Sequence, residues 1–293
     1  MSEQITPVTG GPERRTKDRG PFHLVWDAFF KTLRFIARRV NDVYAVVGIF
    51  ILLGSAVAAG GIWVFVRLAS EVSEGETQGF DVAVLRYIEA HQTPFLDGAA
   101  IEITFLGTGL IVLMLVCVSG MFLWLTKHKH SALLLMVATV GGILLNGLLK
   151  MGFDRPRPQV FAWGQHTVSS SFPSGHAMSA ATVYMTIAYL AARLQRRRLS
   201  RVLTLVAALV IITLIAVSRL YLGVHYPTDV AAGVLMGLAW AAFCMAMLEA
   251  TLLYGRRRSA GMREAEAPTP RDEEAAAETP DDVDVDAHPL RAT

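Results

Sequence analysis

Cysteine is scarce in this chain of 293 residues, which contains Cys117 and Cys244 and no other cysteine. Both lie inside apolar runs, so we expect them to pack as small apolar side chains rather than form a disulfide or a metal site. No pair of cysteines or histidines has the spacing of zinc ligands, and the carboxylates do not cluster as they do around magnesium. The sequence therefore predicts no metal site, and we expect no cofactor.

A large net charge is also missing, because 27 lysines and arginines nearly balance 25 aspartates and glutamates. We expect no nucleic-acid partner. Hydrophobic residues make up 53% of the chain, and the mean hydropathy is +0.42. Soluble domains have a more even balance, so this composition predicts a polytopic membrane protein whose main partner is the bilayer.

The two ends of the chain are polar. We expect no signal peptide in residues 1–42, because no small-residue cleavage site follows a short apolar core. Apolar residues recur at helical spacing in residues 22–40, with basic residues largely elsewhere. This pattern predicts a basic amphipathic helix on an anionic leaflet, with packing on other protein as the alternative. Residues 256–293 begin with three arginines, continue with alanine, proline and acidic residues, and are expected to be disordered.

Residues 43–255 are predicted to form an all-α bundle of six transmembrane helices, since about 20 apolar residues cross a bilayer. The predicted spans cover approximately residues 43–66, 103–125, 131–149, 176–193, 202–217 and 230–253. Residues 67–98 are predicted to form an acidic loop. Within this loop, apolar residues at helical spacing suggest a short surface helix: Phe80, Val84, Leu85 and Ile88.

Lysine and arginine crowd four regions, namely the N-terminal segment, residues 126–130, residues 193–201 and the start of the tail. Six spans place all four on one side, which the positive-inside tendency makes cytoplasmic. The loops at 67–98, 150–175 and 219–228 then face the other side. We therefore expect both termini in the cytoplasm and an extracytoplasmic site in these loops.

Three polar clusters stand out, at residues 150–158 (KMGFDRPRP), 173–176 (PSGH) and 218–229 (SRLYLGVHYPTD). Lys150 and Arg219 end predicted spans, where each alone could be a cation that reaches the interface. Charged residues at membrane depth are usually functional, and the positive-inside tendency disfavours both cations on this side.

The second cluster has the pattern of a helix start, because Ser174 can cap the apolar helix that follows. The free N–H groups of a helix N-terminus form an anion site, and Gly175 lets the backbone approach a ligand closely. Capping alone is the simpler explanation of Ser174.

In the third cluster, Pro227 breaks the chain between two spans, and Thr228 can cap the next helix. Asp229 could then reach the ring of His225, fixing its tautomer and leaving the other ring nitrogen free to attack. The alternative for Asp229 is an interaction with the helix dipole.

Together the clusters provide what phosphoryl transfer without a metal requires: cations and N–H groups for the oxygens, one histidine to attack phosphorus and one to protonate the leaving oxygen. The pattern Lys-x6-Arg-Pro, Pro-Ser-Gly-His and Ser-Arg-x5-His-x3-Asp resembles the signature of the type 2 phosphatidic acid phosphatases, the membrane-integral lipid phosphate phosphatases. The resemblance covers approximately residues 45–250, including the six-span layout. The basic tails and compact loops resemble those of bacterial members, which implies a bacterial plasma (inner) membrane protein with an extracytoplasmic active site.

This resemblance implies a role for each matched residue. His225 would form a phosphohistidine, Asp229 would orient it, and His176 would be the general acid. The lipid phosphate would be held by Lys150, Arg157, Ser174, Gly175 and Arg219. Arg155 does not fit the spacing from Lys150, and we interpret it as a cation outside the immediate phosphate site.

Two other functions stay open. An intramembrane serine hydrolase would use Ser174 as nucleophile and His176 or His225 as base, although it has little use for three cations. A non-catalytic protein that binds or transports lipid phosphates would need the anion site but not both histidines. Among substrates, the family suggests undecaprenyl pyrophosphate first, then phosphatidylglycerophosphate or phosphatidic acid. The sequence does not identify a protein partner.

Overall fold

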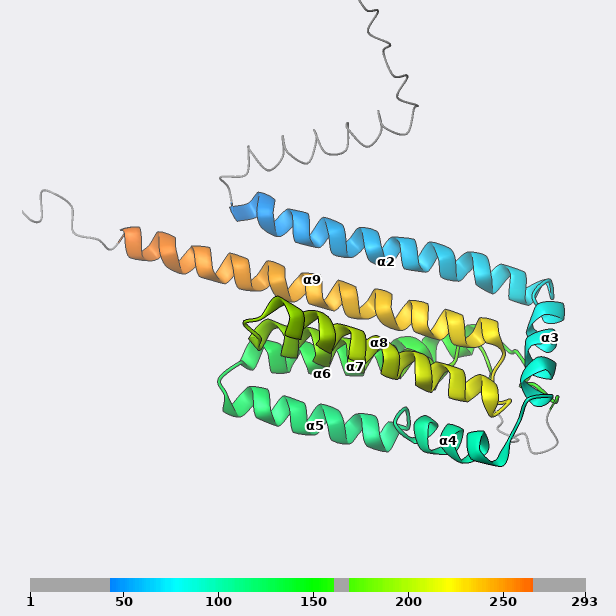
Figure 1. Ribbon diagram of the computed structural model, residues 1–293. Coiled ribbons are helices and arrows are strands. Elements are labelled where there is room, and N and C mark those ends of the chain that lie inside the picture. Colours follow the sequence, from blue (N-terminus) through cyan, green and yellow to red (C-terminus); the bar gives the residue numbers. More distant parts are fainter. Residues whose placement is uncertain (1–42, 161–168, 266–293) are drawn as a thin grey trace, which may run out of the picture. The chain divides into compact units, whose positions relative to one another are not determined.

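The computed structural model describes residues 43–160 and 169–265 of the chain. The chain divides into two compact units, residues 1–45 and 46–293, and the description below concerns the second unit. The amphipathic helix predicted at residues 22–40 and most of the predicted tail lie outside the described residues. All regular secondary structure in the described part is α-helical, which confirms the predicted fold class (Figure 1).

The described residues form a series of helices, and the longest connection between them runs from the end of α6 to the start of α7. In chain order these are α2 (Val43–Ser73), α3 (Gln78–Glu89), α4 (Pro94–Phe105), α5 (Gly109–Leu125), α6 (Lys129–Gly152), α7 (Gly175–Leu194), α8 (Arg198–Tyr221) and α9 (Pro227–Ala265). The last helix continues beyond residue 255, where the sequence predicted the tail to begin.

Five helices of the described part are long and apolar enough to cross a membrane, and the number is six if the bent pair α4–α5 forms one span. The lipid-facing character is visible on α5, where large apolar side chains such as Leu110, Met114, Val118 and Trp124 are exposed. Water would not favour such a surface, but hydrocarbon does. The protein is therefore integral to a membrane.

The span predicted at residues 103–125 is interrupted, because α4 and α5 meet at an angle of 47°. Thr108 between them has an extended backbone. Gly107 lies so close to α8 that a Cβ atom there would be 2.7 Å from Cγ2 of Ile215. The break thus lets the chain approach α8 closely, which an uninterrupted apolar pattern does not reveal.

The acidic segment 67–98 is mostly helical rather than a loop. Helix α2 continues to Ser73, and the suggested surface helix forms as α3. Helix α4 begins at Pro94, and the hydroxyl of the preceding Thr93 caps it by accepting a hydrogen bond of 3.3 Å from the N–H of Leu96. Figure 1 shows α3 running across the ends of longer helices, and it packs against α8 and α9.

Helix α7 is the centre of the bundle, packed against α6, α8 and α9. Its contact with α9 depends on two glycines one turn apart. A Cβ at Gly233 would lie 2.5 Å from the carbonyl oxygen of Ser174, and a Cβ at Gly237 would lie 2.5 Å from that of Met178. Small residues allow such close helix packing in membranes. The contact brings the start of α9 against the start of α7.

Candidate active site

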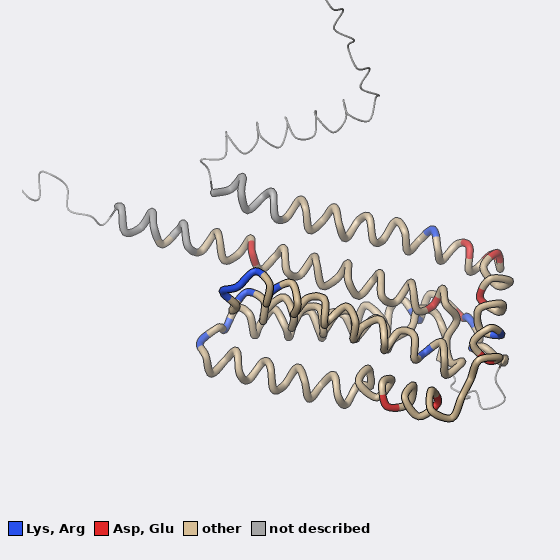
Figure 2. Tube along the Cα trace, viewed as in Figure 1, with Lys and Arg blue, Asp and Glu red and all other residues tan. Residues whose placement is uncertain are grey.

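The three polar clusters meet at one end of the helical bundle. Helices α6 and α8 end there, while α7 and α9 begin there. A backbone hydrogen bond from the N–H of Ser174 to the carbonyl of Asp229, 3.0 Å long, joins the second cluster to the third. Figure 2 shows lysine and arginine at both ends of the helices, whereas the acidic residues gather mostly at one.

His225 and Asp229 form the centre of this end. His225 is 2% exposed and follows a turn in which Gly223 has φ = 61°, a conformation that favours glycine. The imidazole Nδ1 lies 3.6 Å from Oδ2 of Asp229, slightly beyond hydrogen-bond distance. The same Oδ2 accepts a hydrogen bond of 2.9 Å from the N–H of Tyr226. The carboxylate therefore lies at one ring nitrogen and leaves Nε2 for other contacts.

Arg157 lies at that other nitrogen. Its Nη1 is 3.4 Å from Nε2 of His225 and donates to the carbonyl of Val224 at 3.0 Å. The Nζ of Lys150 donates to the carbonyl of Ser170 at 2.9 Å, which anchors the end of α6 to the segment before α7. An anion that approached Nε2 would thus meet the guanidinium of Arg157.

Ser174 lies at the cap position of α7, but its hydroxyl makes no capping hydrogen bond, so the predicted capping role is wrong. The predicted capping by Thr228 is also wrong, because α9 begins at Pro227 and the Thr228 hydroxyl contacts other side chains. At Gly175, a Cβ would lie 3.1 Å from Oδ1 of Asn146. A larger residue would therefore crowd the first turn of α7.

Three buried polar atoms of this site have no hydrogen-bond partner among the described residues: Oγ of Ser174, Nε of Arg219 and Nδ1 of His225. Arg219 does use Nη1, which donates to Thr104 of α4 at 2.8 Å. Buried polar groups are normally satisfied, so unsatisfied ones need an explanation. The hydroxyl of Ser174 and the Nε–H of Arg219 can donate hydrogen bonds to an anion, as a phosphate site requires, whereas Nδ1 of His225 faces Asp229.

Burial lowers the pKa of His225 from 6.5 to about 4. Asp229 opposes this shift, while the positive charges of Arg157 and Arg219 add to it. Burial likewise lowers the pKa of Arg157. The lowered pKa keeps the His225 imidazole neutral near pH 7, which is the form that can attack an electrophile.

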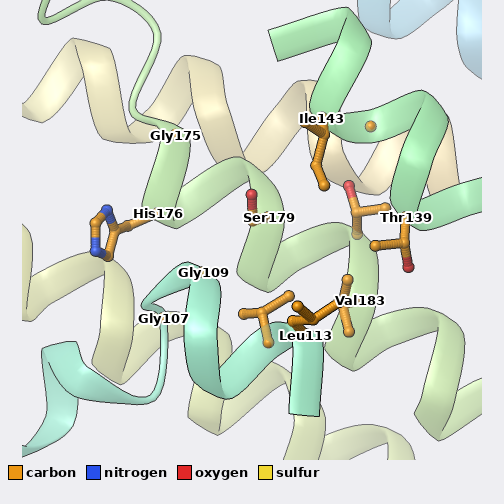
Figure 3. A pocket seen from close by; sticks show the side chains of 12 residues that line it. Gly107, Gly109, Leu113, Thr139, Ile143, Gly175, His176, Ser179 and Val183 are labelled. Atoms are coloured by element: carbon orange, nitrogen blue, oxygen red, sulfur yellow. The ribbon is translucent and has the colours of Figure 1, made fainter. Parts of the chain in front are cut away.

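A cavity of about 180 Å³ lies next to His176, between α5, α6 and α7. In Figure 3, Thr139 and Ile143 come from α6 and Leu113 from α5, while His176, Ser179 and Val183 come from α7. Apart from His176 and three hydroxyls its lining is glycine and apolar side chains. The cavity thus offers an apolar surface beside a proton donor or acceptor.

His176 also lies with the charged residues at this end, within range of electrostatic interaction with Arg219, His225, Arg157 and Lys150. The structure therefore brings together all eight residues predicted for the site. Among the described residues, no three His, Cys, Asp or Glu side chains come together as metal ligands do.

Two charged residues of this end were not assigned to the site from the sequence. Asp81 of α3 is fully buried, although the segment around it was expected to be an exposed acidic loop. Arg155 contacts both Asp81 and Asp229, at 2.7 and 2.6 Å. A signal was present, because Asp81 precedes Leu85 by four residues and so shares the apolar face of α3. Thr104, the partner of Arg219, carried no such signal.

An integral membrane bundle that gathers two histidines, a carboxylate and three cations at one end has the composition of a membrane phosphatase. Comparison with known proteins agrees, because the family model of the PAP2 superfamily matches residues 129–252. The chain is 35% identical over 175 residues to phosphatidylglycerophosphatase B of Bacillus subtilis, which covers 59% of this chain and 86% of the relative.

A second relative is an undecaprenyl-diphosphatase of Sulfolobus acidocaldarius, 26% identical over 178 residues, covering 59% of this chain and 80% of the relative. The crystal structure of the first transmembrane PAP2-type phosphatidylglycerolphosphate phosphatase from Bacillus subtilis superposes with a TM-score of 0.59 at 30% identity, covering 69% of this chain and 96% of that one. The chain belongs to the PAP2 superfamily. It is a lipid phosphatase.

Proposed function

We propose that this phosphatase transfers the phosphoryl group of a lipid phosphate first to Nε2 of His225 and then to water, without a metal ion. One observation carries the proposal. The buried His225 ring has the Asp229 carboxylate at Nδ1 and the Arg157 guanidinium at Nε2. The carboxylate side favours a proton on Nδ1, so the lone pair of Nε2 is directed to the place where a phosphate would lie against Arg157.

In the first step, Nε2 attacks phosphorus, a P–N bond forms, and the bond from phosphorus to the lipid oxygen breaks. Charge on the non-bridging oxygens is neutralised by Lys150, Arg157 and Arg219, with the Ser174 hydroxyl and the N–H groups at the start of α7 as further donors. Protonated His176 gives its proton to the departing oxygen. The apolar cavity beside His176 can take the part of the lipid next to that oxygen.

In the second step, water attacks the phosphohistidine. Neutral His176 accepts a proton from that water, the P–N bond breaks, and His225 leaves as the neutral imidazole. Phosphate then dissociates, and His176 is again protonated for the next turnover. Each histidine thus returns to its starting form.

We place the site on the extracytoplasmic side of a bacterial plasma membrane. The support is the charge pattern, because the connections at the opposite end of the bundle carry the exposed basic residues expected in the cytoplasm (Figure 2). A lipid with its headgroup at the outer surface would then reach the site from the bilayer.

For the substrate, we put phosphatidylglycerophosphate ahead of undecaprenyl diphosphate, and phosphatidic acid after both. This order reverses the first two substrates suggested by the sequence. The reason is that the relative sharing 35% identity is a phosphatidylglycerophosphatase, whereas the undecaprenyl-diphosphatase shares 26%.

The test is phosphate release by the detergent-purified protein from these three lipids, with EDTA present. We expect turnover in EDTA and a ³²P-labelled enzyme that is stable in alkali and labile in acid, as a phosphohistidine is. Turnover that needs added magnesium would contradict the metal-free reaction. Label that survives acid and disappears in Ser174→Ala would point to serine as the nucleophile instead.

A serine hydrolase is disfavoured by the geometry, because the buried Ser174 hydroxyl has no hydrogen bond to either histidine. A fluorophosphonate probe that labelled Ser174 would revive that alternative. A non-catalytic binding protein would instead keep its cellular function when His225 is replaced by alanine.

A further inference from the structure

Behind the phosphate site lies a chain of three charged side chains, of which the reaction described above uses only Asp229. Its members are Asp81 on α3, Arg155 on the segment after α6, and Asp229 at the start of α9. The side chain of Arg155 is 9% exposed and both carboxylates are fully buried. Burying three charges is costly, so their arrangement needs a physical reason.

Asp81 uses both carboxylate oxygens to hold the start of α9. Its Oδ1 accepts a hydrogen bond of 3.1 Å from the N–H of Thr228, and its Oδ2 accepts one of 2.6 Å from the Thr228 hydroxyl. The same Oδ2 is 2.7 Å from Nη2 of Arg155. A helix that crosses the end of the bundle is thus connected to the residue directly before Asp229.

Arg155 bridges the two carboxylates. Its Nη1 donates to Oδ1 of Asp229 at 2.6 Å and to the Thr228 hydroxyl at 2.8 Å. The guanidinium also lies over the Tyr226 ring, 4.2 Å from its centroid. This planar group is therefore held on several sides, and its contact with Oδ1 leaves Oδ2 of Asp229 facing the N–H of Tyr226 and the His225 ring.

The neighbouring Arg157 contacts different groups from those that Arg155 contacts. It lies at Nε2 of His225, on the side where the phosphate would bind, whereas Arg155 lies behind Asp229, on the far side of the carboxylate. The two Arg-Pro pairs in residues 155–158 thus place one guanidinium in front of the nucleophile and one behind its carboxylate partner.

We propose that Asp81 and Arg155 are positioning residues, which fix the orientation of the Asp229 carboxylate and through it the ring of the nucleophile His225. The inference rests on the proposed phosphohistidine reaction. It adds two residues that act through Asp229 and do not touch the substrate, and one of them, Asp81, lies outside the part of the chain that matches the family model.

The first test compares Arg155→Met with Arg157→Met by steady-state kinetics on phosphatidylglycerophosphate. We expect Arg155→Met to lower kcat about 100-fold with nearly unchanged KM, because a nucleophile misplaced by about 1 Å loses that much. Arg157→Met should raise KM and weaken inhibition by vanadate, since it removes a phosphate contact. Arg155→Lys should lie between wild type and Arg155→Met, because one ammonium cannot bridge the same partners.

The second test is a double-mutant cycle with Asp81→Asn. We expect kcat of Asp81→Asn to fall about tenfold, and the double variant Asp81→Asn/Arg155→Met to be no slower than Arg155→Met alone, because residues in one network are not additive. Thr228→Val removes the hydroxyl that joins the two residues and leaves no charge unpaired. It should reduce kcat by a smaller factor, even if the charged variants fold poorly.

Asp97→Asn is the matched control. Asp97 also accepts a hydrogen bond at this end, from the Tyr221 hydroxyl at 2.7 Å, but it has no contact with the site residues. Its kcat should equal that of the wild type. Rates are normalised to the amount of protein that elutes as a monodisperse peak from a detergent column.

Two outcomes would overturn the inference. The first is normal kcat per folded molecule in Arg155→Met and Thr228→Val, with only thermal stability reduced, since the network would then be purely structural. The second is a rise in KM for Arg155→Met equal to that for Arg157→Met. The proposed function fails separately, when His225→Ala keeps its activity or no acid-labile phosphoenzyme forms.

Discussion

Each end of the helical bundle holds a contact between arginine and a carboxylate, and the two contacts differ in burial. At the end opposite the site, Arg193 of α7 and Glu249 of α9 approach to 2.9 Å with 28% of each side chain exposed, and Tyr189 donates a hydrogen bond to the same carboxylate. At the site, Asp81 and Asp229 are fully buried around Arg155. The first pair joins two helices, whereas the second belongs to a network that reaches His225, the proposed nucleophile.

The cations around these contacts also differ. At the opposite end, the basic residues of the connections are exposed: Lys127, Lys129, Arg196, Arg197, Arg198 and Arg201. Around the site, four partly or fully buried cations surround two buried carboxylates, and the cations are Lys150, Arg155, Arg157 and Arg219. Exposed cations are solvated by water and lipid headgroups. A buried excess of positive charge is stabilised when an anion binds, which supports the proposal that phosphate binds at this end and not at the other.

The largest expected effect is the loss of His225, the proposed nucleophile. His225→Ala should lower kcat at least about 1,000-fold, or ~4 kcal/mol of transition-state stabilisation, because in the proposed reaction this side chain forms the P–N bond. The measurement is phosphate release from phosphatidylglycerophosphate together with ³²P labelling, which should disappear. Retention of label in His225→Ala would assign the nucleophile to another residue.

The next effect tests the proposed role of His176 as the general acid. His176→Ala should slow a lipid phosphomonoester about 100-fold, at the lower end of the usual contribution of a general acid. A lipid diphosphate should be slowed less, because its leaving group is a phosphate that departs more easily without a proton. Equal factors for the two substrates would exclude His176 as the donor to the leaving oxygen.

The helices could be predicted from apolar run length, but not every end of them. The pattern Phe80, Val84, Leu85 and Ile88 predicted α3 within an acidic segment, and the structure confirms that helix. The break between α4 and α5 was missed, because it depends on a contact between Gly107 and Ile215, which lie far apart in the sequence. Run length contains no information on such contacts.

The site could be predicted where the residues form local patterns. His225 and Asp229 are four residues apart, so their proximity follows from a turn and a helix start. Asp81 and Arg155 are 74 residues apart, and only folding shows that they meet. An isolated aspartate in an acidic segment looks solvated, and the burial that makes it important is decided by the packing of α3 on α8 and α9.

A smaller effect concerns the pH at which the His225 ring becomes protonated. With a pKa of about 4, the ring is about nine-tenths neutral at pH 5, whereas with the ordinary value of 6.5 it would be about 3% neutral. We expect ¹³C-labelled histidine NMR in detergent, assigned with His225→Ala, to show this titration near pH 4. Bound vanadate should move the pKa upward, because a negative charge next to the ring favours its protonated form. A free-enzyme titration at 6.5 or above would contradict the lowered pKa.

The lowered pKa of His225 also affects the stability of the folded protein. Because the folded pKa lies below the unfolded value, the unfolded chain binds the proton more readily, and the folded state loses stability as pH falls from about 6.5 to about 4. His225→Ala removes this contribution. Its thermal midpoint should therefore fall less than that of the wild type between pH 7 and pH 5.

The smallest effect is expected at the opposite end of the bundle. Glu249→Gln breaks the contact with Arg193 but keeps a group that can accept the hydrogen bond of Tyr189. We expect it to cost about 1 kcal/mol of stability, as partly exposed ion pairs do, and to lower the thermal midpoint by about 2–4 °C. Its kcat should be unchanged, because this contact joins α7 to α9 far along both helices from His176 and Asp229. A loss of kcat as large as that of Asp81→Asn would mean that any broken ion pair disturbs the site, and the contrast between the two ends would no longer distinguish a structural pair from a positioning network.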